Sequence, residues 1–289
     1  MMSKRKRINY RDPHTSDSDA YSEIKSIDDL PHNTSSWTKD ICRSLNIRYE
    51  NASSIDELVQ QSNVDDSEEI LLDGYDLHKP YDIDLKLSSS VTTIVRKARK
   101  IINNPYVKEV LIDAFVMSLL NYVGFDRDPF DMFPQYDFSA SIGNDHKITS
   151  KVEFMIIKQE QYVVFIVEDK RPASVAELTD WGEPQIAGEL FVSAFHNVFL
   201  GYAKYPIKVF AIRVVGTYFT FYKSEISRSY MEESLQNLPV RNSMVIKRFP
   251  AQEGFREDGS RVLTAWDFCN PDDRKEIIKT LKSFCQPEF

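Results

Sequence analysis

The chain has 289 residues, of which 42% are hydrophobic, and this is enough apolar material for one or two domains with a substantial core. It contains only 9 glycines and neither a GxxxxGK[ST] nor a GxGxxG pattern, which argues against phosphate-loop and glycine-rich nucleotide folds. The net charge of −8 does not favour a nucleic-acid binder. The sequence has no apolar run of membrane-spanning length and no apolar segment behind its basic start, so we expect an intracellular protein.

Residues 1–35 are polar and without hydrophobic periodicity, so we expect a disordered tail. Its block Lys4–Arg7 (KRKR) is typical of a nuclear import signal and equally of a solvated basic tail, and both interpretations stay open. Residues 36–89 form an acidic arm with predicted short helices, one of them after Ser54. Because residues 1–90 hold 11 Lys and Arg against 18 Asp and Glu, the remainder is close to neutral.

Two helices are predicted next. The stretch 90–103 has apolar residues at helical spacing, and its basic cluster could offer a local phosphate-binding face: Arg96, Lys97, Arg99 and Lys100. The stretch 105–125 begins with proline, ends near Gly124 and is apolar nearly all round, so we expect it to be buried.

The hydrophobic period then changes to that of strands. Three strands are expected at 136–142, 151–158 and 161–168, the last two as a hairpin. A helix follows at 183–202, and then a further strand pair at 207–215 and 217–223. A closing helix is expected at 270–284, capped by Asn270. This order predicts an α/β domain over residues 90–289, with a mixed central sheet flanked by helices.

The strand VVFIVEDKRP (163–172) ends unusually, in two acids and two bases. Glu168 and Lys170 project together, because side chains two apart on a strand share a face. A tight hairpin brings Glu153 of the preceding strand to the same end of the sheet. Two close carboxylates repel unless a cation bridges them, and oxygen ligands of this kind suit Mg²⁺ or Mn²⁺. A neighbouring lysine could orient an attacking water or neutralise charge on phosphorus.

The order helix, strand, acid-bearing strand, E-x-K strand, helix resembles the PD-(D/E)XK superfamily of restriction-endonuclease-like nucleases. The run KVEF, IVEDKR, EPQIAGEL and FAIRVVGTYFTFYK also looks like nuclease-like domains of fungal proteins and Crinkler-type effectors. The resemblance covers roughly residues 105–225. It departs from the usual pattern in having glutamate at position 153, where aspartate is commoner, and no PD dipeptide.

The resemblance implies a metal-dependent nuclease in which Glu153 and Glu168 bind the ion, Asp169 contributes its main-chain carbonyl and Lys170 assists. It implies DNA rather than RNA as the substrate, although nothing in the residues selects between them. Gln185 falls where several branches carry a glutamine, and Glu109 where some carry an additional acid.

Alternatives remain at several positions. Asp137 could be the first acid instead of Glu153, and the charged residues could be no more than a salt-bridged sheet edge. Gln185 and Glu189 lie one turn apart on one helix face, where Gln185 could hold water, phosphate or Lys170. A surface glutamine is the plain alternative. A catalytically inactive nuclease-fold module that binds protein or nucleic acid is the second functional hypothesis.

The histidines and cysteines give weaker indications of function. The five histidines show no metal-binding spacing, and His196 on an apolar helix is expected to be a satisfied core residue. Cys42, Cys269 and Cys285 are far apart or unpaired, which indicates reduced thiols rather than a disulfide framework or a zinc site.

Overall fold

The computed structural model describes most of the chain. The described residues are 24–61, 67–79, 86–104, 106–143, 146–158, 162–170, 182–201, 204–251 and 264–285; for 162–166 and 168–170 the backbone alone is described. The predicted tail residues 1–23, with the basic block Lys4–Arg7, lie outside this part.

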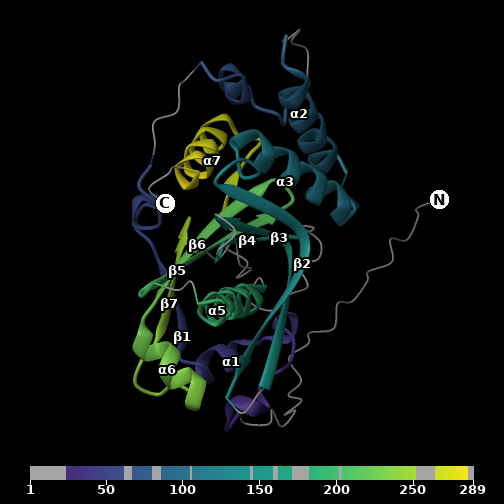
Figure 1. The fold of residues 1–289 in the computed structure, drawn as a ribbon. Coiled ribbons are helices and arrows are strands. Elements are labelled where there is room, and N and C mark those ends of the chain that lie inside the picture. The colour runs from purple at the N-terminus through teal and green to yellow at the C-terminus, as the bar shows by residue number, and fades with distance from the viewer. Residues whose placement is uncertain are drawn as a thin grey trace, which may run out of the picture.

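A mixed eight-stranded sheet runs through the described part (Figure 1). Its strands are β1 (Ile47–Asn51), β2 (Phe130–Ile142), β3 (His146–Lys158), β4 (Tyr162–Lys170), β5 (Ile207–Val215), β6 (Tyr218–Ile226), β7 (Met244–Phe249) and β8 (Trp266–Asp267). The order is β1-β7-β6-β5-β4-β3-β2, with β8 beside β6. Strands β2, β3 and β4 are antiparallel, whereas β4–β5 and β1–β7 are parallel pairs. The three strands predicted first therefore share one sheet.

Helices cover both faces of the sheet (Figure 1). On one side lie α2 (Ser89–Ile102), α3 (Glu109–Val123) and α7 (Pro271–Phe284); on the other lie α1 (Lys39–Ser44), α5 (Glu183–Phe199) and α6 (Arg228–Gln236). Each side has its own hydrophobic core, here called the α3 core and the α5 core. In β5, Ile212 and Val214 belong to the α3 core and Val209 and Ala211 to the α5 core, as strand alternation requires.

Local signals explain where the main helices begin and end. The Ser88 hydroxyl accepts from Val91 N at the start of α2, and the Asn270 side chain caps α7, with Pro271 in its first turn. Gly124 ends α3 at φ 111°, a conformation that glycine adopts without a Cβ clash. The predicted burial of this helix holds for Phe115 and Leu119 but not for Val110, which is 61% exposed.

The N-terminal segment is built into the fold. The prediction of a disordered tail up to residue 35 does not hold from Ile24 onward, because Ile27 and Leu30 are buried in the α5 core. The acidic arm likewise supplies β1 to the sheet edge, and it adds Leu58 and Leu77 to the α3 core. Hydrophobic residues between polar stretches account for the difference, since burying them offsets the entropy of ordering the segment.

Candidate functional site

The register of β3 and β4 sets the candidate site. Phe154 pairs with Val167, and Met155 with Ile166, in the antiparallel ladder. Continued by one residue, this register puts Glu153 opposite Glu168. The predicted hairpin is therefore found in the backbone, whereas the proximity of Glu153 and Glu168, which lie one residue beyond the last pair, stays a prediction.

Strand β3 is irregular at Glu153. Val152 packs in the α5 core and Phe154 in the α3 core, although residues two apart on a regular strand share a face. Opposite this point on β2, Gln135 has φ 49°, and the strand pairing passes from Pro134–Phe154 directly to Tyr136–Val152. Irregularities of this kind re-aim a side chain, and they are frequent beside active sites. Glu153 is half-buried at the break.

The E-x-K residues lie at the end of β4. Glu168 pairs with Arg213 of β5, Asp169 with Val214 and Lys170 with Val215. Because Val167 belongs to the α3 core, positions 168 and 170 fall on the α5 face of the strand. The side chains of Glu168, Asp169 and Lys170 lie outside the described part, so their convergence on a metal stays a prediction.

Helix α5 brings two further polar residues to this face. Gln185 is half-buried, and its Nε2 donates a hydrogen bond to Glu189 Oε1 at 2.8 Å. Glu189 is fully buried among residues of the α5 core. The predicted one-turn pairing is confirmed. The surface interpretation of Gln185 is wrong, because the side chain is half-buried and bonded to a buried carboxylate.

The first turn of α5 contains a carboxylate, that of Glu183, which is ion-paired with Arg248. Arg248 Nη1 contacts Glu183 Oε1 and Oε2 at 2.5 and 2.7 Å, and both side chains are largely buried. The Tyr49 hydroxyl donates to the Glu183 carbonyl at 2.6 Å. Burial raises the pKa of Tyr222 beside this pair, and the Glu183 carboxylate adds to the effect. These contacts fix the start of α5 against β1 and β7.

Arg213 places a second cation on the same face. It is 3% exposed, and its Nη2 has no hydrogen-bond partner among the described residues. Its backbone neighbour on β4 is Glu168. A buried guanidinium requires compensation, so the face combines acids and bases in a low-dielectric setting.

The two accessory candidates lie further away. Asp137 is exposed on β2 and pairs with Lys151, so β3 separates it from β4. Glu109 is half-buried in the first turn of α3, on the opposite side of the sheet from α5. His196, expected to be satisfied, has Nδ1 3.3 Å from the Ser139 carbonyl oxygen.

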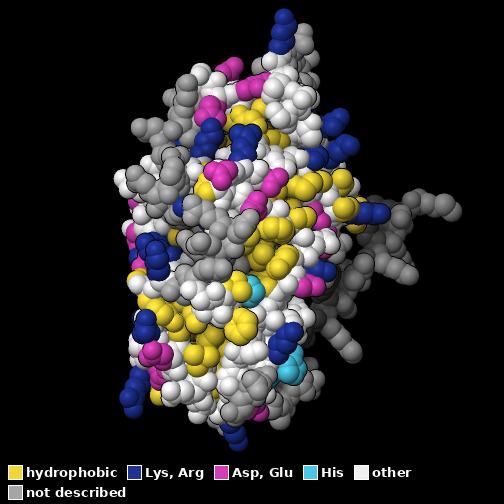
Figure 2. All heavy atoms as spheres, in the orientation of Figure 1, with side chains coloured by type: hydrophobic (Ala, Val, Ile, Leu, Met, Phe, Trp, Pro, Cys, Tyr) yellow, Lys and Arg dark blue, Asp and Glu magenta, His cyan; other side chains and the backbone are white. Residues whose placement is uncertain are grey.

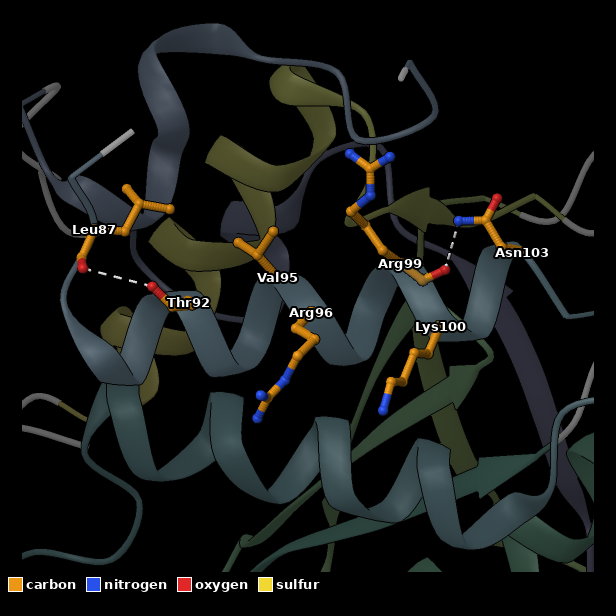
Figure 3. Close-up of a pocket in the computed structure, with 7 residues that line it drawn as sticks. All are labelled: Leu87, Thr92, Val95, Arg96, Arg99, Lys100 and Asn103. Carbon is orange, nitrogen blue, oxygen red and sulfur yellow. Dashed lines mark hydrogen bonds between the residues drawn. The ribbon is translucent and has the colours of Figure 1, made fainter. Parts of the chain in front are cut away.

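Three of the four residues in the predicted basic cluster line a groove of about 420 Å³ on α2. Figure 3 shows Arg96 and Lys100 extending toward α3, with Arg99 on the other side. Lys97 instead lies between the helices, where its Nζ donates to the Ala114 carbonyl at 2.7 Å, and burial lowers its pKa. On the face drawn in Figure 2, basic and acidic side chains are interspersed.

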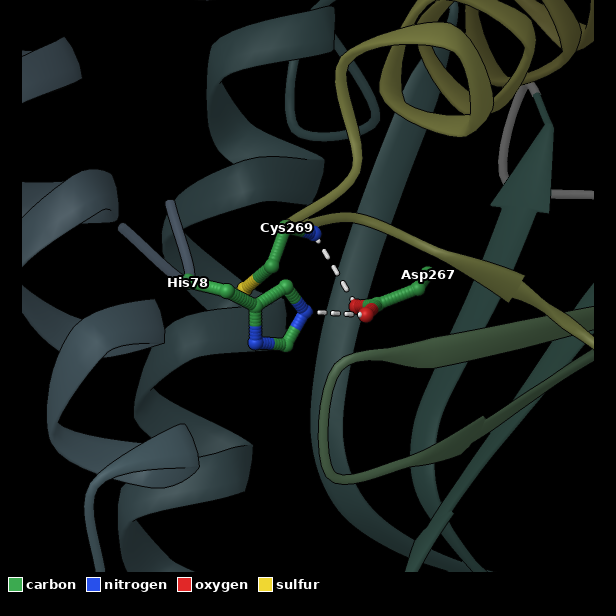
Figure 4. Close-up of side chains that lie close together, drawn as sticks. All are labelled: His78, Asp267 and Cys269. Carbon is green, nitrogen blue, oxygen red and sulfur yellow. Dashed lines mark hydrogen bonds and ion pairs between the residues drawn. The ribbon is translucent and has the colours of Figure 1, made fainter. Parts of the chain in front are cut away.

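Sequence reasoning missed one cluster altogether. His78, Asp267 and Cys269 each offer a ligand atom, and these atoms lie within 4.8 Å of one another (Figure 4). His78 is 189 positions from Asp267 in the chain, so no spacing rule could connect them. The short pattern Asp-Phe-Cys at 267–269 is a signal only once the fold brings the histidine to it.

No protein-family model and no curated protein matches the chain. Among the described residues, no helix is both long and apolar enough to span a bilayer. The site is therefore interpreted from its own geometry.

Proposed function

We propose that the protein is a metal-dependent nuclease with a restriction-endonuclease-like core. The supporting observation is the β3–β4 register, in which Phe154 pairs with Val167, so that Glu153 and Glu168 are the next residues of their strands at an irregular point of β3. The order of the core elements agrees with this: an antiparallel β2-β3-β4 meander, the crossover helix α5 and the parallel strand β5. Strand alternation from Val167 assigns positions 168 and 170 to the sheet face that α5 covers, the side on which Gln185 and Glu189 lie.

The donor set fits a hard divalent ion such as Mg²⁺ or Mn²⁺. Glu153, Glu168 and the main-chain carbonyl of Asp169 offer oxygen ligands only, as these ions prefer. The bound ion would supply Lewis-acid activation of a phosphodiester. Lys170 would hold the attacking water and neutralise charge on the phosphoryl oxygens, and Gln185 would orient that water through its amide. The water oxygen bonds to phosphorus and gives up one proton to solvent, the bond to the leaving sugar oxygen breaks, and that oxygen takes up one proton from solvent.

The test is Mg²⁺-dependent cleavage by the purified full chain on a panel of single- and double-stranded DNA and RNA, with DNA as the expected substrate. Lys170→Ala should lower the rate by about 100-fold or more. Lys151→Ala is the matched control, because Lys151 is an exposed lysine of the same hairpin. Equal cleavage by wild type and Lys170→Ala would refute the assignment, as would an inert wild type with Mg²⁺ and Mn²⁺.

A nuclease-fold module without catalysis is the second candidate. Two observations favour it: Glu183 and Arg248 already occupy the α5 start, and Gln185 is bonded to Glu189. Calorimetric titration with Mg²⁺ and Mn²⁺ separates the candidates. A nuclease binds the ion, and Glu168→Gln weakens that binding, whereas a binding module has no need of metal at these carboxylates.

A further inference from the structure

The cluster of His78, Asp267 and Cys269 brings together three segments of the chain. His78 lies in the turn that follows Asp76. Asp267 is the last residue of β8, which pairs with β6, and Cys269 lies in the turn before α7. Main-chain bonds already join them, since Leu77 N donates to the Cys269 carbonyl at 2.9 Å. The cluster is apart from β3, β4 and α5, so it is independent of the proposed nuclease chemistry.

The three side chains are arranged around the Asp267 carboxylate. Asp267 Oδ2 is 2.7 Å from His78 Nε2, and Oδ1 accepts from Thr217 Oγ1 at 2.8 Å and from Cys269 N at 3.0 Å. Figure 4 shows the His78 ring and the Cys269 side chain on the same side of this carboxylate. Oδ1 is therefore fixed by its donors, while Oδ2 faces the histidine.

The kind of donor atom selects the kind of cation. One imidazole nitrogen, one carboxylate oxygen and one sulfur form a mixed set that suits Zn²⁺, whereas Mg²⁺ and Ca²⁺ take oxygen ligands. In a tetrahedral zinc site with ordinary bond lengths the ligand atoms are about 3.5 Å apart. The observed separations, all within 4.8 Å, require shifts of about 1 Å. The half-exposed His78 side chain can supply such a shift, since 47% of it is accessible.

We propose that His78, Asp267 and Cys269 form a three-ligand site for a borderline divalent cation of the Zn²⁺ class, with water as the fourth ligand. His78 leaves one side of the site open to solvent, and Cys269 closes the other because it is fully buried. Three protein ligands with one open position is a recurrent zinc arrangement.

The electrostatic surroundings act in both directions: the raised pKa of the Cys269 thiol and the nearby Arg274 cation oppose metal binding, whereas the neighbouring carboxylates favour it. Burial raises the pKa of the Cys269 thiol to about 12, and the negative charges of Asp267 and Asp76 raise it further. The same negative charges attract a cation. Binding replaces the thiol proton by the metal ion and releases that proton to solvent. The nearby Arg274 guanidinium is held by main-chain carbonyls, among them those of Leu71 and Tyr75.

The experiment uses the purified full chain, reduced and stripped with a chelator, and titrated with Co²⁺ as a spectroscopic probe for zinc. We expect one equivalent to give the visible bands of a tetrahedral ion and a near-ultraviolet thiolate-to-metal band, both removed by Zn²⁺. Zn²⁺ at about 100 times its dissociation constant should raise the melting temperature by about 4–5 °C.

Two variants and two controls decide the assignment. Cys269→Ser should lose the thiolate band, and His78→Ala should lose the melting-temperature gain. If replacing the buried Cys269 prevents folding, His78→Ala still tests the site, because the His78 side chain is half-exposed. Cys285→Ser and His32→Ala should behave as wild type. A wild type without the thiolate band would overturn the proposal, and so would a band that survives in Cys269→Ser or disappears in Cys285→Ser.

Discussion

Burial of Glu189 on the α5 face costs free energy, because a carboxylate in an apolar core loses its hydration. It is fully buried among Leu190, Phe191 and their neighbours, and Gln185 donates a hydrogen bond to it. The sequence indicates only that the two residues lie one turn apart on one helix face. The structure makes the two residues one unit, in which each holds the other in place.

Gln185→Ala should therefore lower stability as well as cleavage. Removing the amide leaves a buried carboxylate oxygen without this donor, which costs about 1–3 kcal/mol. We expect the melting temperature to fall by at least about 2 °C. Thermal unfolding followed by circular dichroism measures the change, with Lys208→Ala, at an exposed position on β5, as the control. A Gln185→Ala protein as stable as this control would show that the hydrogen bond contributes nothing.

Glu233 provides a pH-dependent contact at the end of α6. Its carboxylate accepts from Val240 N, Arg241 N and Asn242 N at 2.8, 3.0 and 3.0 Å. The hydrogen bonds, led by that from Val240, lower the pKa of Glu233 to about 2 from 4.5. A carboxyl whose folded-state pKa is depressed stabilises the protein above its unfolded pKa and loses this effect as the pH falls.

The wild type should thus lose stability between about pH 4.5 and pH 2, and Glu233→Gln should lose less over this range. At pH 7 the variant should have the lower urea midpoint, and the gap should narrow on acidification. Glu232→Gln, at the exposed neighbouring position, is the control. A gap between wild type and Glu233→Gln that does not depend on pH would contradict this account.

At the scale of elements, periodicity predicted much of the fold. The signals for α2, α3, α5 and α7 and for strands β3 to β6 were strong, because each has a clear apolar pattern and local caps or turns. Strands β1 and β7 were missed, since each is short and their pairing with each other joins residues about 200 positions apart. For the same reason, the break at Glu153 depends on a backbone conformation at Gln135 that no residue pattern announces.

The candidate site, like the fold, was predicted only in its local relations. The sequence located Glu153 and Glu168 on neighbouring strands and Gln185 on the following helix, because these relations are local. Arg213 and Arg248 were not predicted to lie on the same face, because their positions depend on the order of strands in the sheet. Strand order is a property of tertiary packing.

Helix α5 touches the N-terminal segment most closely at Gly188. A Cβ built on this glycine would lie 2.8 Å from Trp37 Cδ2 and 3.0 Å from Thr34 Cβ. The contact with Trp37 is shorter than real Cβ atoms show, and the contact with Thr34 is tighter than most. The glycine is needed for close approach of the segment, one turn after Gln185.

Gly188→Ala should accordingly destabilise the protein. Alanine favours the helix by about 1 kcal/mol, but overpacking costs about 1–3 kcal/mol. The net effect is a lower denaturation midpoint, and Trp37→Leu should offset part of it in the double variant. A urea-unfolding double-mutant cycle measures the coupling, with Ser89→Ala at an exposed helical position as the control for helix propensity. A stabilised single variant would show that the segment moves aside without penalty.

At the scale of the whole molecule, the segment from Ile24 onward acts as part of the α5 core. The Trp37 and Phe191 rings lie 5.6 Å apart, and Thr149 N donates to the His32 carbonyl at 2.8 Å. These contacts tie the segment to both α5 and β3. The stability of the site face therefore depends on residues far from it in the sequence.

A truncated chain that begins at Lys39 should melt at a lower temperature and bind an apolar dye, because it uncovers the α5 surface around Phe191. A chain that begins at Ile24 keeps Ile27, Leu30 and Trp37 and is the matched comparison. Differential scanning calorimetry and dye fluorescence measure the two effects. Equal melting temperatures for the two truncated chains would remove the segment from the core.

The parallel pairing of β1 with β7 also has a consequence during synthesis. β1 ends at Asn51 and its partner ends at Phe249, so about 200 residues must be translated before the pair can form. At cellular elongation rates of 5–20 residues per second this takes about 10–40 s. Throughout that interval the main-chain donors and acceptors of β1 lack the strand that pairs with them in the folded protein. The yield of folded protein is therefore expected to depend on the speed of translation.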